Sequence, residues 1–505
     1  MGDEKTLFAV LLCAVASLAL VLKWRRNKSR PPYPPGPKGY LLIGNILDVP
    51  QNIPIWQAFI PLARKFDTDV LYLKLFTTDF IVLNSTEAIT DLLEKQSKIY
   101  SDRMSPPLRS MDVYSWDFAL NGYGSRWRRC RKLFHEFLNV NAVSRFDNYL
   151  DKHTRRFLSR LAETPDNFLD HTQFVTGALV MEMTYGMDIK SHEDKFLQAA
   201  ERAMGHLESA VVPGAFLVDT FPILKHVPDW FPGAGFKQFA KAGRDLFDVA
   251  VNGPLNYVKE SLKANGSNVS IAASCFDRVA ELADQGFDES VVRAVTATMY
   301  IVLRTFFLVA ALHPHVVRKA QEELDRVVGG ERLPQLSGQE DLPYISALIK
   351  ELLRWCCPAP FGVPKRVTED NIYKGYFIPA GATIIENIWA ICYDGTVYPA
   401  PHTYDPERFL KDGKLDRSIK DPEDMVFGTG RRICPGRWFA LRTLFLNIAC
   451  TLAIFDIEAP AGEKLEPKFH ESHVRHAIPF KCVIKPRSEA KLKLIRDSDV
   501  TAGLN

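Results

Sequence analysis

The sequence lacks the cysteine spacing of a disulfide-stabilised protein. Its nine cysteines are an odd number scattered along the chain, and Cys356 and Cys357 are the only adjacent pair. That pattern favours a reducing compartment over an oxidising one. A strong excess of one charge is also missing, because the formal net charge is only +3 over 505 residues. So mild a balance argues against nucleic acid as a partner.

Linkers, internal repeats and low-complexity tracts are absent between about residue 40 and the C-terminus. The length alone would allow about two to four domains. Because no change in composition marks a boundary, we expect one large domain over residues 41–505.

The N-terminus carries a run of seventeen residues without a charge, from Thr6 to Leu22. This is the lower edge of the roughly 17–25 residues that span a bilayer. Acidic residues precede the run and basic residues follow it, which predicts an uncleaved anchor with the rest of the chain in the cytoplasm. A cleaved signal peptide is the alternative, but its leading region should be positive. We expect a membrane anchor and basic flank over residues 1–30, and a stiff proline-rich hinge over residues 31–40.

The spacing of apolar residues predicts a mainly α protein with a small β part. Helices are expected at Trp127 to Val140, Ala142 to Leu161, Phe236 to Lys263, His315 to Val328 and Tyr344 to Trp355. Alternation predicts a strand pair within Leu71 to Leu83. A hairpin from Tyr373 to Gly381 leads into a strand at Thr383 to Ile385.

One cysteine lies in a loop rich in glycine and arginine, Phe427 to Gly436, which reads FGTGRRICPG. Cys434 comes just before a helical-looking segment, whose N-terminal N–H groups would favour a thiolate. The glycines allow the backbone to approach a flat ligand, and Arg431 and Arg432 can pair with carboxylates. A lone cysteine is more often a buried core residue. The interpretation therefore depends on the surrounding pattern.

Two further elements accompany this loop. Glu351 and Arg354 are three residues apart in a helical run and would face the same side of the helix. Alone, such a pair is most often a surface ion pair, but the segment Pro406-Glu407-Arg408-Phe409 follows it. Taken together with the Cys434 loop, these elements resemble the cytochrome P450 family, in the style of its fungal microsomal members. The resemblance extends from the N-terminal run to Pro486.

The resemblance implies a cytochrome P450-like fold with an N-terminal transmembrane helix. It also implies haem b as cofactor, with Cys434 as the catalytic residue whose thiolate binds the iron. The residues implied for cofactor binding are Trp127, Arg131, Lys365, Phe427, Arg432 and Gly436. Lys365 stands where relatives often have histidine or arginine. Glu351, Arg354 and Arg408 would form a buried network that holds the cysteine loop.

The implied reaction inserts one oxygen atom from O2 into a lipophilic small molecule. Terpenoids, aromatic polyketides and xenobiotics are candidate substrates by resemblance only. Electrons would come from a separate NADPH-cytochrome P450 reductase, because the chain has no flavin or nicotinamide motif of its own. The implied location is the endoplasmic reticulum membrane, with a single pass and the catalytic domain in the cytoplasm.

The chain departs from the family in the long helix expected to cross the haem. Relatives carry a run resembling A-G-x-D-T-T there, and this chain has none between Tyr300 and Val302. About eight residues are missing, or roughly 12 Å of helix. The explanations are a mis-joined exon, a catalytically weakened copy, or a working enzyme that delivers protons through Thr296, Thr298 or water. A haem-thiolate isomerase or dehydratase and a non-catalytic haem-binding protein stay as alternatives.

Four segments should line the substrate pocket by position: Ser105 to Leu120, Ala294 to Ile301, Ala359 to Val363, and His473 to Ile478. The first is mostly apolar and suits a lipophilic ligand. The last is more polar than expected. One hypothesis is that His473, Arg475 and His476 meet a carboxylate or hydroxyl of the substrate, and the other is that they are exposed loop charges.

Overall fold

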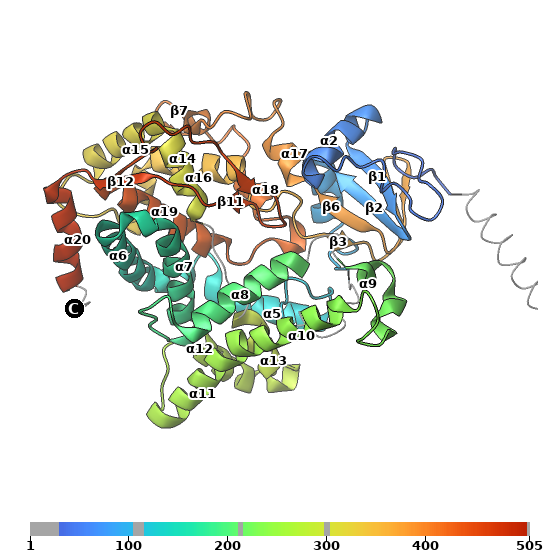
Figure 1. Cartoon of the computed structure of the whole chain (residues 1–505), viewed down its shortest axis with the longest axis horizontal. Coiled ribbons are helices and arrows are strands. Elements are labelled where there is room, and N and C mark those ends of the chain that lie inside the picture. Colours follow the sequence, from blue (N-terminus) through green and yellow to red (C-terminus); the bar gives the residue numbers. More distant parts are fainter. Residues whose placement is uncertain (1–29, 105–115, 211–215, 297–302, 502–505) are drawn as a thin grey trace, which may run out of the picture.

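The computed structural model describes residues 30–104, 116–210, 216–296 and 303–501. Helices make up most of the molecule, and a small four-stranded sheet lies at the opposite end from the C-terminal helix α20 (Glu489–Thr501) (Figure 1). This confirms the prediction of a mainly helical protein with a small β part.

The four-stranded sheet joins two distant parts of the chain. Its strands are β1 (Val70–Leu75), β2 (Thr78–Leu83), β6 (Thr383–Glu386) and β3 (Lys365–Arg366), in that spatial order. The pairs β1–β2 and β3–β6 are antiparallel and β2–β6 is parallel. The predicted strand pair and the hairpin β4 (Asn371–Tyr373) to β5 (Tyr376–Ile378) are both confirmed.

The remaining strands form two-stranded pairs. These are β7 (Leu410–Lys411) with β8 (Lys414–Leu415), β9 (Phe455–Glu458) with β12 (Val483–Pro486), and β10 (Phe469–His470) with β11 (His476–Ala477).

The predicted helices are all present. The longer helices are α2 (Ile55–Lys65), α5 (Ser125–Leu138), α6 (Asp147–Glu163), α7 (Phe168–Tyr185), α8 (Lys195–Ala210), α10 (Gly235–Phe247), α11 (Gly253–Asn265), α12 (Ile271–Glu281), α13 (Glu289–Thr296), α14 (Arg304–Leu312), α15 (Pro314–Val327), α16 (Pro343–Cys356) and α19 (Arg437–Ile454). The short ones are α3 (Thr86–Ile89), α9 (Leu217–Thr220), α17 (Ile388–Cys392) and α18 (Glu423–Val426). The range Phe236 to Lys263 was expected as one helix, and a π-helical turn, Asp248–Asn252, divides it into α10 and α11.

The main core surrounds α19, which is apolar on all sides and therefore suits a fully buried position. Within the part of the chain that the structure describes, α19 is the one helix long and apolar enough to cross a membrane, and most of it is buried in the protein. Its composition is thus explained by core packing. The predicted anchor, Thr6 to Leu22, lies outside the described residues.

The proline-rich segment is docked onto two strands. The Tyr72 N–H donates to the Pro35 carbonyl at 3.0 Å, and the Phe377 N–H donates to the Pro32 carbonyl at 2.8 Å. The ring of Tyr33 stacks on Tyr72 with centroids 4.7 Å apart. The segment is extended, as expected, but its stiffness is reinforced by β1 and β5.

The shortened central helix falls partly outside the described residues. Helix α13 ends at Thr296 and α14 begins at Arg304, while residues 297–302, which contain the predicted gap, are not described. The side chains of α13 and α14 are largely buried in the main core. Both flanks of the gap therefore belong to the packed interior.

Candidate functional site

The Cys434 loop folds back on itself before α19. The Cys434 N–H donates to the Phe427 carbonyl at 2.7 Å, which closes the loop at its base. Gly430 has φ +62°, and a Cβ there would lie 2.0 Å from the Leu93 carbonyl oxygen. Only glycine fits this left-handed position with backbone so near. The loop is thus pressed against the segment that follows α3.

Helix α5 lies beside the loop and brings Trp127 and Arg131 to it. The Arg432 guanidinium lies 4.4 Å from the centroid of the Trp127 ring. Arg131 Nη1 donates to the Ile433 carbonyl. Arg432 also donates to the carbonyls of Ser101 and Asn121, at 2.8 and 2.7 Å. Trp127, Arg131 and Arg432 are therefore brought together around the residue that precedes Cys434.

Cys434 lies deep in the protein but keeps part of its surface uncovered. Burial raises the pKa of its thiol above the ordinary value. A hydrogen bond from the Gly436 N–H and the positive charges of Arg131 and Arg437 act in the opposite direction. The expected positive surroundings are present, but burial outweighs them. A thiolate here requires a further positive charge, such as that of a metal ion.

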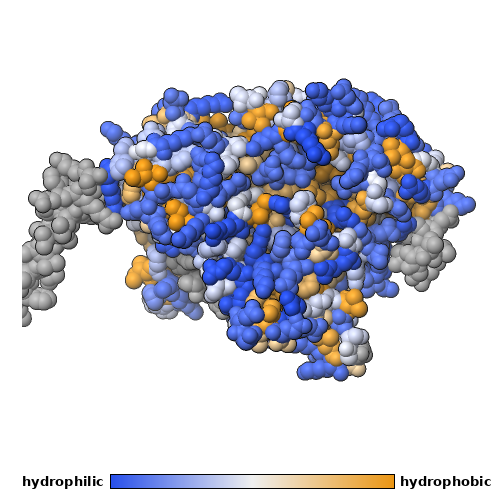
Figure 2. Space-filling model, turned by 180° about the vertical axis from the view of Figure 1, so that it is seen from behind, coloured by the Kyte–Doolittle hydropathy of each residue, from blue (hydrophilic) through white to orange (hydrophobic). Residues whose placement is uncertain are grey.

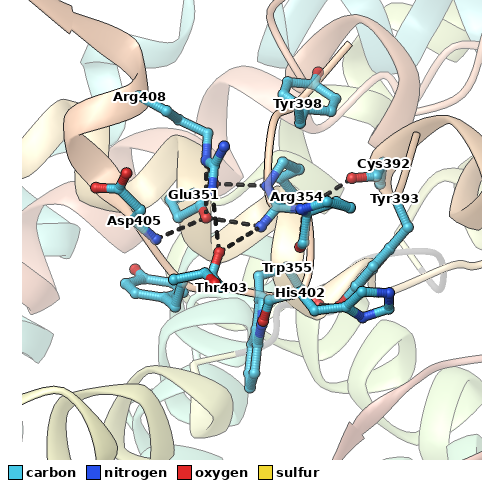
Figure 3. Close-up of polar contacts among 12 residues, drawn as sticks. Glu351, Arg354, Trp355, Cys392, Tyr393, Tyr398, His402, Thr403, Asp405 and Arg408 are labelled. Carbon is cyan, nitrogen blue, oxygen red and sulfur yellow. Dashed lines mark hydrogen bonds and ion pairs between the residues drawn. The ribbon is translucent and has the colours of Figure 1, made fainter. Parts of the chain in front are cut away.

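The charged triad predicted from sequence is formed and buried (Figure 3). Arg354 Nε and Nη2 each donate to the Glu351 carboxylate at 2.7 Å. Arg408 Nε donates to the same carboxylate at 3.2 Å, and the Asp405 N–H does so at 2.9 Å. Glu351 and Arg354 are fully buried in α16.

The remaining donors of the triad bind backbone carbonyls. Arg354 Nη1 donates to the carbonyls of Cys392 and Pro401, both at 2.8 Å, and Arg408 Nη1 donates to Pro399 at 2.7 Å. Figure 3 shows these groups converging from α16 and from the segment after α17. The network thus ties α16 to residues 392–408. That it holds the cysteine loop stays a prediction.

Lys365 has a partner that the sequence reasoning missed. Its ammonium forms an ion pair with Glu386, and both side chains are only 3% exposed. Burial, and then Arg103 and Arg432, lower the pKa of Lys365. The Thr429 hydroxyl donates to the other Glu386 oxygen at 2.5 Å. Lys365 is thus connected to the Cys434 loop indirectly, because the Glu386 carboxylate contacts both the Lys365 ammonium and Thr429 of that loop.

Arg103 is a second residue that sequence reasoning missed. It is buried, and its guanidinium donates to the carbonyls of Val363, Pro364 and Ala119. These bonds fix the segment just before Lys365. No motif predicted this role, because the partners are backbone groups from distant parts of the chain.

Arg475 is not an exposed charge. It is 6% exposed, donates to the Cys356 carbonyl at 2.6 Å, and lies 3.5 Å from the centroid of Phe469. Its neighbour His473 lies deep in the protein, and its Nδ1 has no hydrogen-bond partner. The hypothesis of an exposed charge was therefore wrong for Arg475, while contact with a substrate stays a hypothesis. The guanidinium fixes the C-terminal end of α16.

A small cavity of about 80 Å³ lies between α7, α8 and α13. Trp116 and Thr296 line it, and these residues come from two of the segments predicted to form the pocket. The rest of its wall is mostly apolar and includes Met181, Leu197 and Phe247. One carboxylate, Glu201, also faces it. Most of Ser105 to Leu120 and most of Ala294 to Ile301 lie outside the described residues.

Comparisons with known proteins agree with this arrangement. A sequence profile of the cytochrome P450 family matches residues 34–484. The chain is 38% identical over 512 residues to Cytochrome P450 monooxygenase COX2 of Coprinopsis cinerea, covering 97% of this chain and 95% of that protein. It is 37% identical to Cytochrome P450 monooxygenase ARMGADRAFT_974139 of Armillaria gallica, covering 97% and 99%. It is 34% identical to Tryptamine 4-monooxygenase of Psilocybe cyanescens, covering 93% and 96%.

Proposed function

Because the chain belongs to the cytochrome P450 family, whose members hold a haem through a cysteine thiolate, we propose that it is a haem-thiolate monooxygenase with Cys434 as the iron ligand. The observation that carries this proposal is Cys434 itself, which lies deep in the protein, in a glycine-flanked loop and with part of its surface uncovered. When bound, the haem supplies the activation of dioxygen for insertion into a lipophilic substrate.

The residues around the loop fit a haem in charge and shape. A ligand with two carboxylates needs cations at its edge. Arg432 and Lys365 are buried cations beside the loop, and the Trp127 indole lies against the Arg432 guanidinium. A Cβ added at Gly436 would meet nothing within 4 Å, so the backbone next to Cys434 borders free space. Arg131 holds the carbonyl before Cys434 and thereby orients the thiol.

We also propose that the protein is anchored in the endoplasmic reticulum membrane, with its catalytic domain in the cytoplasm. The surface in Figure 2 is largely hydrophilic, with small separate apolar patches. The most exposed apolar side chains include Leu41 (91%), Leu42 (83%), Trp230 (81%) and Ile223 (74%). Leu41 and Leu42 follow the proline-rich segment, next to the predicted anchor. Exposed apolar side chains near an anchor suit contact with lipid.

The outer face of α5 is the proposed docking surface for an NADPH-cytochrome P450 reductase. Trp127 is buried toward the Cys434 loop, while Arg128 and Lys132 are exposed. Basic side chains on the surface nearest the cofactor would attract an acidic partner.

The substrate is proposed to be a lipophilic small molecule, in keeping with the apolar cavity that Trp116 and Thr296 share. Terpenoids, aromatic polyketides and xenobiotics stay candidate classes. The name of one relative, a tryptamine 4-monooxygenase, adds an indole amine to these candidates.

The ferrous–CO difference spectrum of the full chain in membranes tests the proposal. A red-shifted Soret band is expected from thiolate-ligated haem, and product formation with NADPH and reductase is expected to follow. Expressed protein without such a band would overturn the proposal. Turnover without NADPH would favour an isomerase or dehydratase, and a band without any turnover would favour a haem-binding protein that does not catalyse.

A further inference from the structure

Glu386 is a buried carboxylate in a strand that is otherwise apolar or hydroxylic. It is 2% exposed, and β6 reads Thr-Ile-Ile-Glu with all four residues buried. A buried carboxylate is unfavourable unless it is paired and hydrogen-bonded. Glu386 meets both conditions, through the Lys365 ammonium and the Thr429 hydroxyl.

The two partners come from two separate parts of the site. Lys365 belongs to β3, which is antiparallel to β6. Thr429 lies in the Cys434 loop and is 1% exposed. A single carboxylate therefore connects the strand that carries a cofactor-binding cation to the loop that carries the proposed iron ligand.

We propose that Glu386 is a positioning residue of the haem site, which holds Lys365 beside the Cys434 loop and sets the charge presented to the haem carboxylates. This inference rests on the proposed haem-thiolate function. It goes further, because Glu386 belongs to none of the motifs that identify the family in this chain.

The charges around Lys365 support this role. Lys365 interacts electrostatically with Arg103 and Arg432, so three cations lie in one buried region. Glu386 adds one negative charge, and the group of four carries a formal charge of +2. The two ionised carboxylates of a haem together carry the opposite charge. Without Glu386 the region would be more positive, and without Lys365 it would hold an unpaired carboxylate next to the haem carboxylates.

Charge effects distinguish this role from a purely structural one. A nearby negative charge stabilises oxidised, more positive iron over reduced iron. Removing it with Glu386→Gln, which keeps the side-chain shape, should raise the haem reduction potential. Removing the cation with Lys365→Met should lower the potential. The double variant should return near the parent value, because the two charges cancel.

Haem retention provides a second readout. Lys365→Met is expected to release haem at least about tenfold faster to an acceptor protein, since Glu386 is then unpaired and repels the haem carboxylates. Adding Glu386→Gln to this variant should recover most of the retention. Glu386→Gln alone should have the smaller effect.

The experiment uses the full chain in membranes, with spectroelectrochemical titration and haem-transfer rates on the parent and the three variants. Glu182→Gln is the control, because Glu182 pairs with Lys152 and His153, each at 2.6 Å, between α6 and α7 and not with a residue of the Cys434 loop. It should leave the potential unchanged. An unshifted potential in Glu386→Gln, or a double variant that loses haem as fast as Lys365→Met, would overturn the inference.

Failure of the proposed function would look different. In that case the parent itself would show no thiolate-ligated haem. The ion pair would still be testable by urea unfolding of the same four chains, where Lys365→Met should be less stable than the double variant. Equal stability of these two chains would count against the pairing.

Discussion

Arg354 binds the Glu351 carboxylate through two hydrogen bonds, in which Nε and Nη2 each donate to a different oxygen at 2.7 Å. Neither side chain is exposed to solvent. The remaining Arg354 donor binds the carbonyls of Cys392 and Pro401. Every donor of a buried cation is thus directed at an acceptor. This geometry requires the planar fork of arginine, which lysine cannot reproduce.

Glu351→Gln should lower the free energy of unfolding by about 3–5 kcal/mol, because it leaves two buried guanidinium groups without a counter-ion. Urea unfolding followed by tryptophan fluorescence measures this at equal haem occupancy. Glu407→Gln is the control, since Glu407 pairs with Lys319 at 2.7 Å on the surface. Its loss should be below about 1 kcal/mol. Similar losses in both variants would show that the buried triad contributes no more to the free energy of unfolding than an ion pair on the surface.

Arg354→Lys should not preserve the stability of the parent. One ammonium cannot reach both Glu351 oxygens and the carbonyls of Cys392 and Pro401. We expect most of the destabilisation of Glu351→Gln in this variant, measured in the same way. Parent-like unfolding would mean that charge alone suffices and that the fork geometry is unnecessary.

Cys434→Ser should abolish the red-shifted ferrous–CO band, because an alcohol does not replace the thiolate as iron ligand. Cys450→Ser is the matched control, since Cys450 is a buried cysteine on α19, where its Sγ contacts the Pro334 carbonyl at 3.5 Å. The control should keep the band. A band that survives in Cys434→Ser would assign the iron ligand elsewhere.

Arg131→Gln and Arg128→Gln separate the two faces of α5. Arg131 contacts the Ile433 carbonyl, so its replacement should reduce haem content by several-fold at equal protein expression, measured by pigment content. Arg128 is exposed. Its replacement should leave haem content unchanged and raise the reductase concentration needed for half-maximal reduction, most clearly at low salt. Loss of haem in both variants would assign both residues to folding.

The helices were predictable from sequence because the repeat of apolar residues is local information. The π-helical turn at Asp248–Asn252 was not, since one extra residue in a turn leaves the apolar pattern nearly intact. The pairing of β2 with β6 could not be predicted from sequence either. The register Leu83↔Glu386 joins residues about 300 positions apart, and no local pattern specifies it.

In the candidate site, too, the features set by local sequence patterns were predicted and those set by distant contacts were not. Cys434 and the Glu351 triad belong to short motifs, and Trp127 and Arg131 were assigned through the family resemblance that these motifs carry. Glu386 was missed because its strand is otherwise apolar or hydroxylic, although a single carboxylate at the end of such a run was a usable signal. The expectation of an exposed charge at Arg475 failed because a polar segment suggests a surface, whereas Arg475 is buried and its Nη1 donates to the Cys356 carbonyl.

The protein should be less stable in mild acid, because the buried His473 side chain resists taking up a proton in the folded state. Burial, with Arg103 nearby, lowers the pKa of His473 to about 4, and Nδ1 has no hydrogen-bond partner. The unfolded chain accepts a proton at the ordinary value of about 6.5. Between these values the unfolded state binds more protons, so this contribution is complete above about pH 6.5 and is lost as the pH falls toward about 4. The slope is at most about 1.4 kcal/mol per pH unit.

Urea unfolding of the parent and His473→Phe at several pH values in this window measures the effect. The variant should lose less stability on acidification, because phenylalanine cannot take up a proton and can keep the edge contact with the Phe361 ring, 4.9 Å away. His402→Gln, at an exposed position, should follow the parent curve. If His473→Phe shows the same slope as the parent, other groups must account for the acid sensitivity, and His473 would not be the neutral, buried imidazole that its surroundings favour.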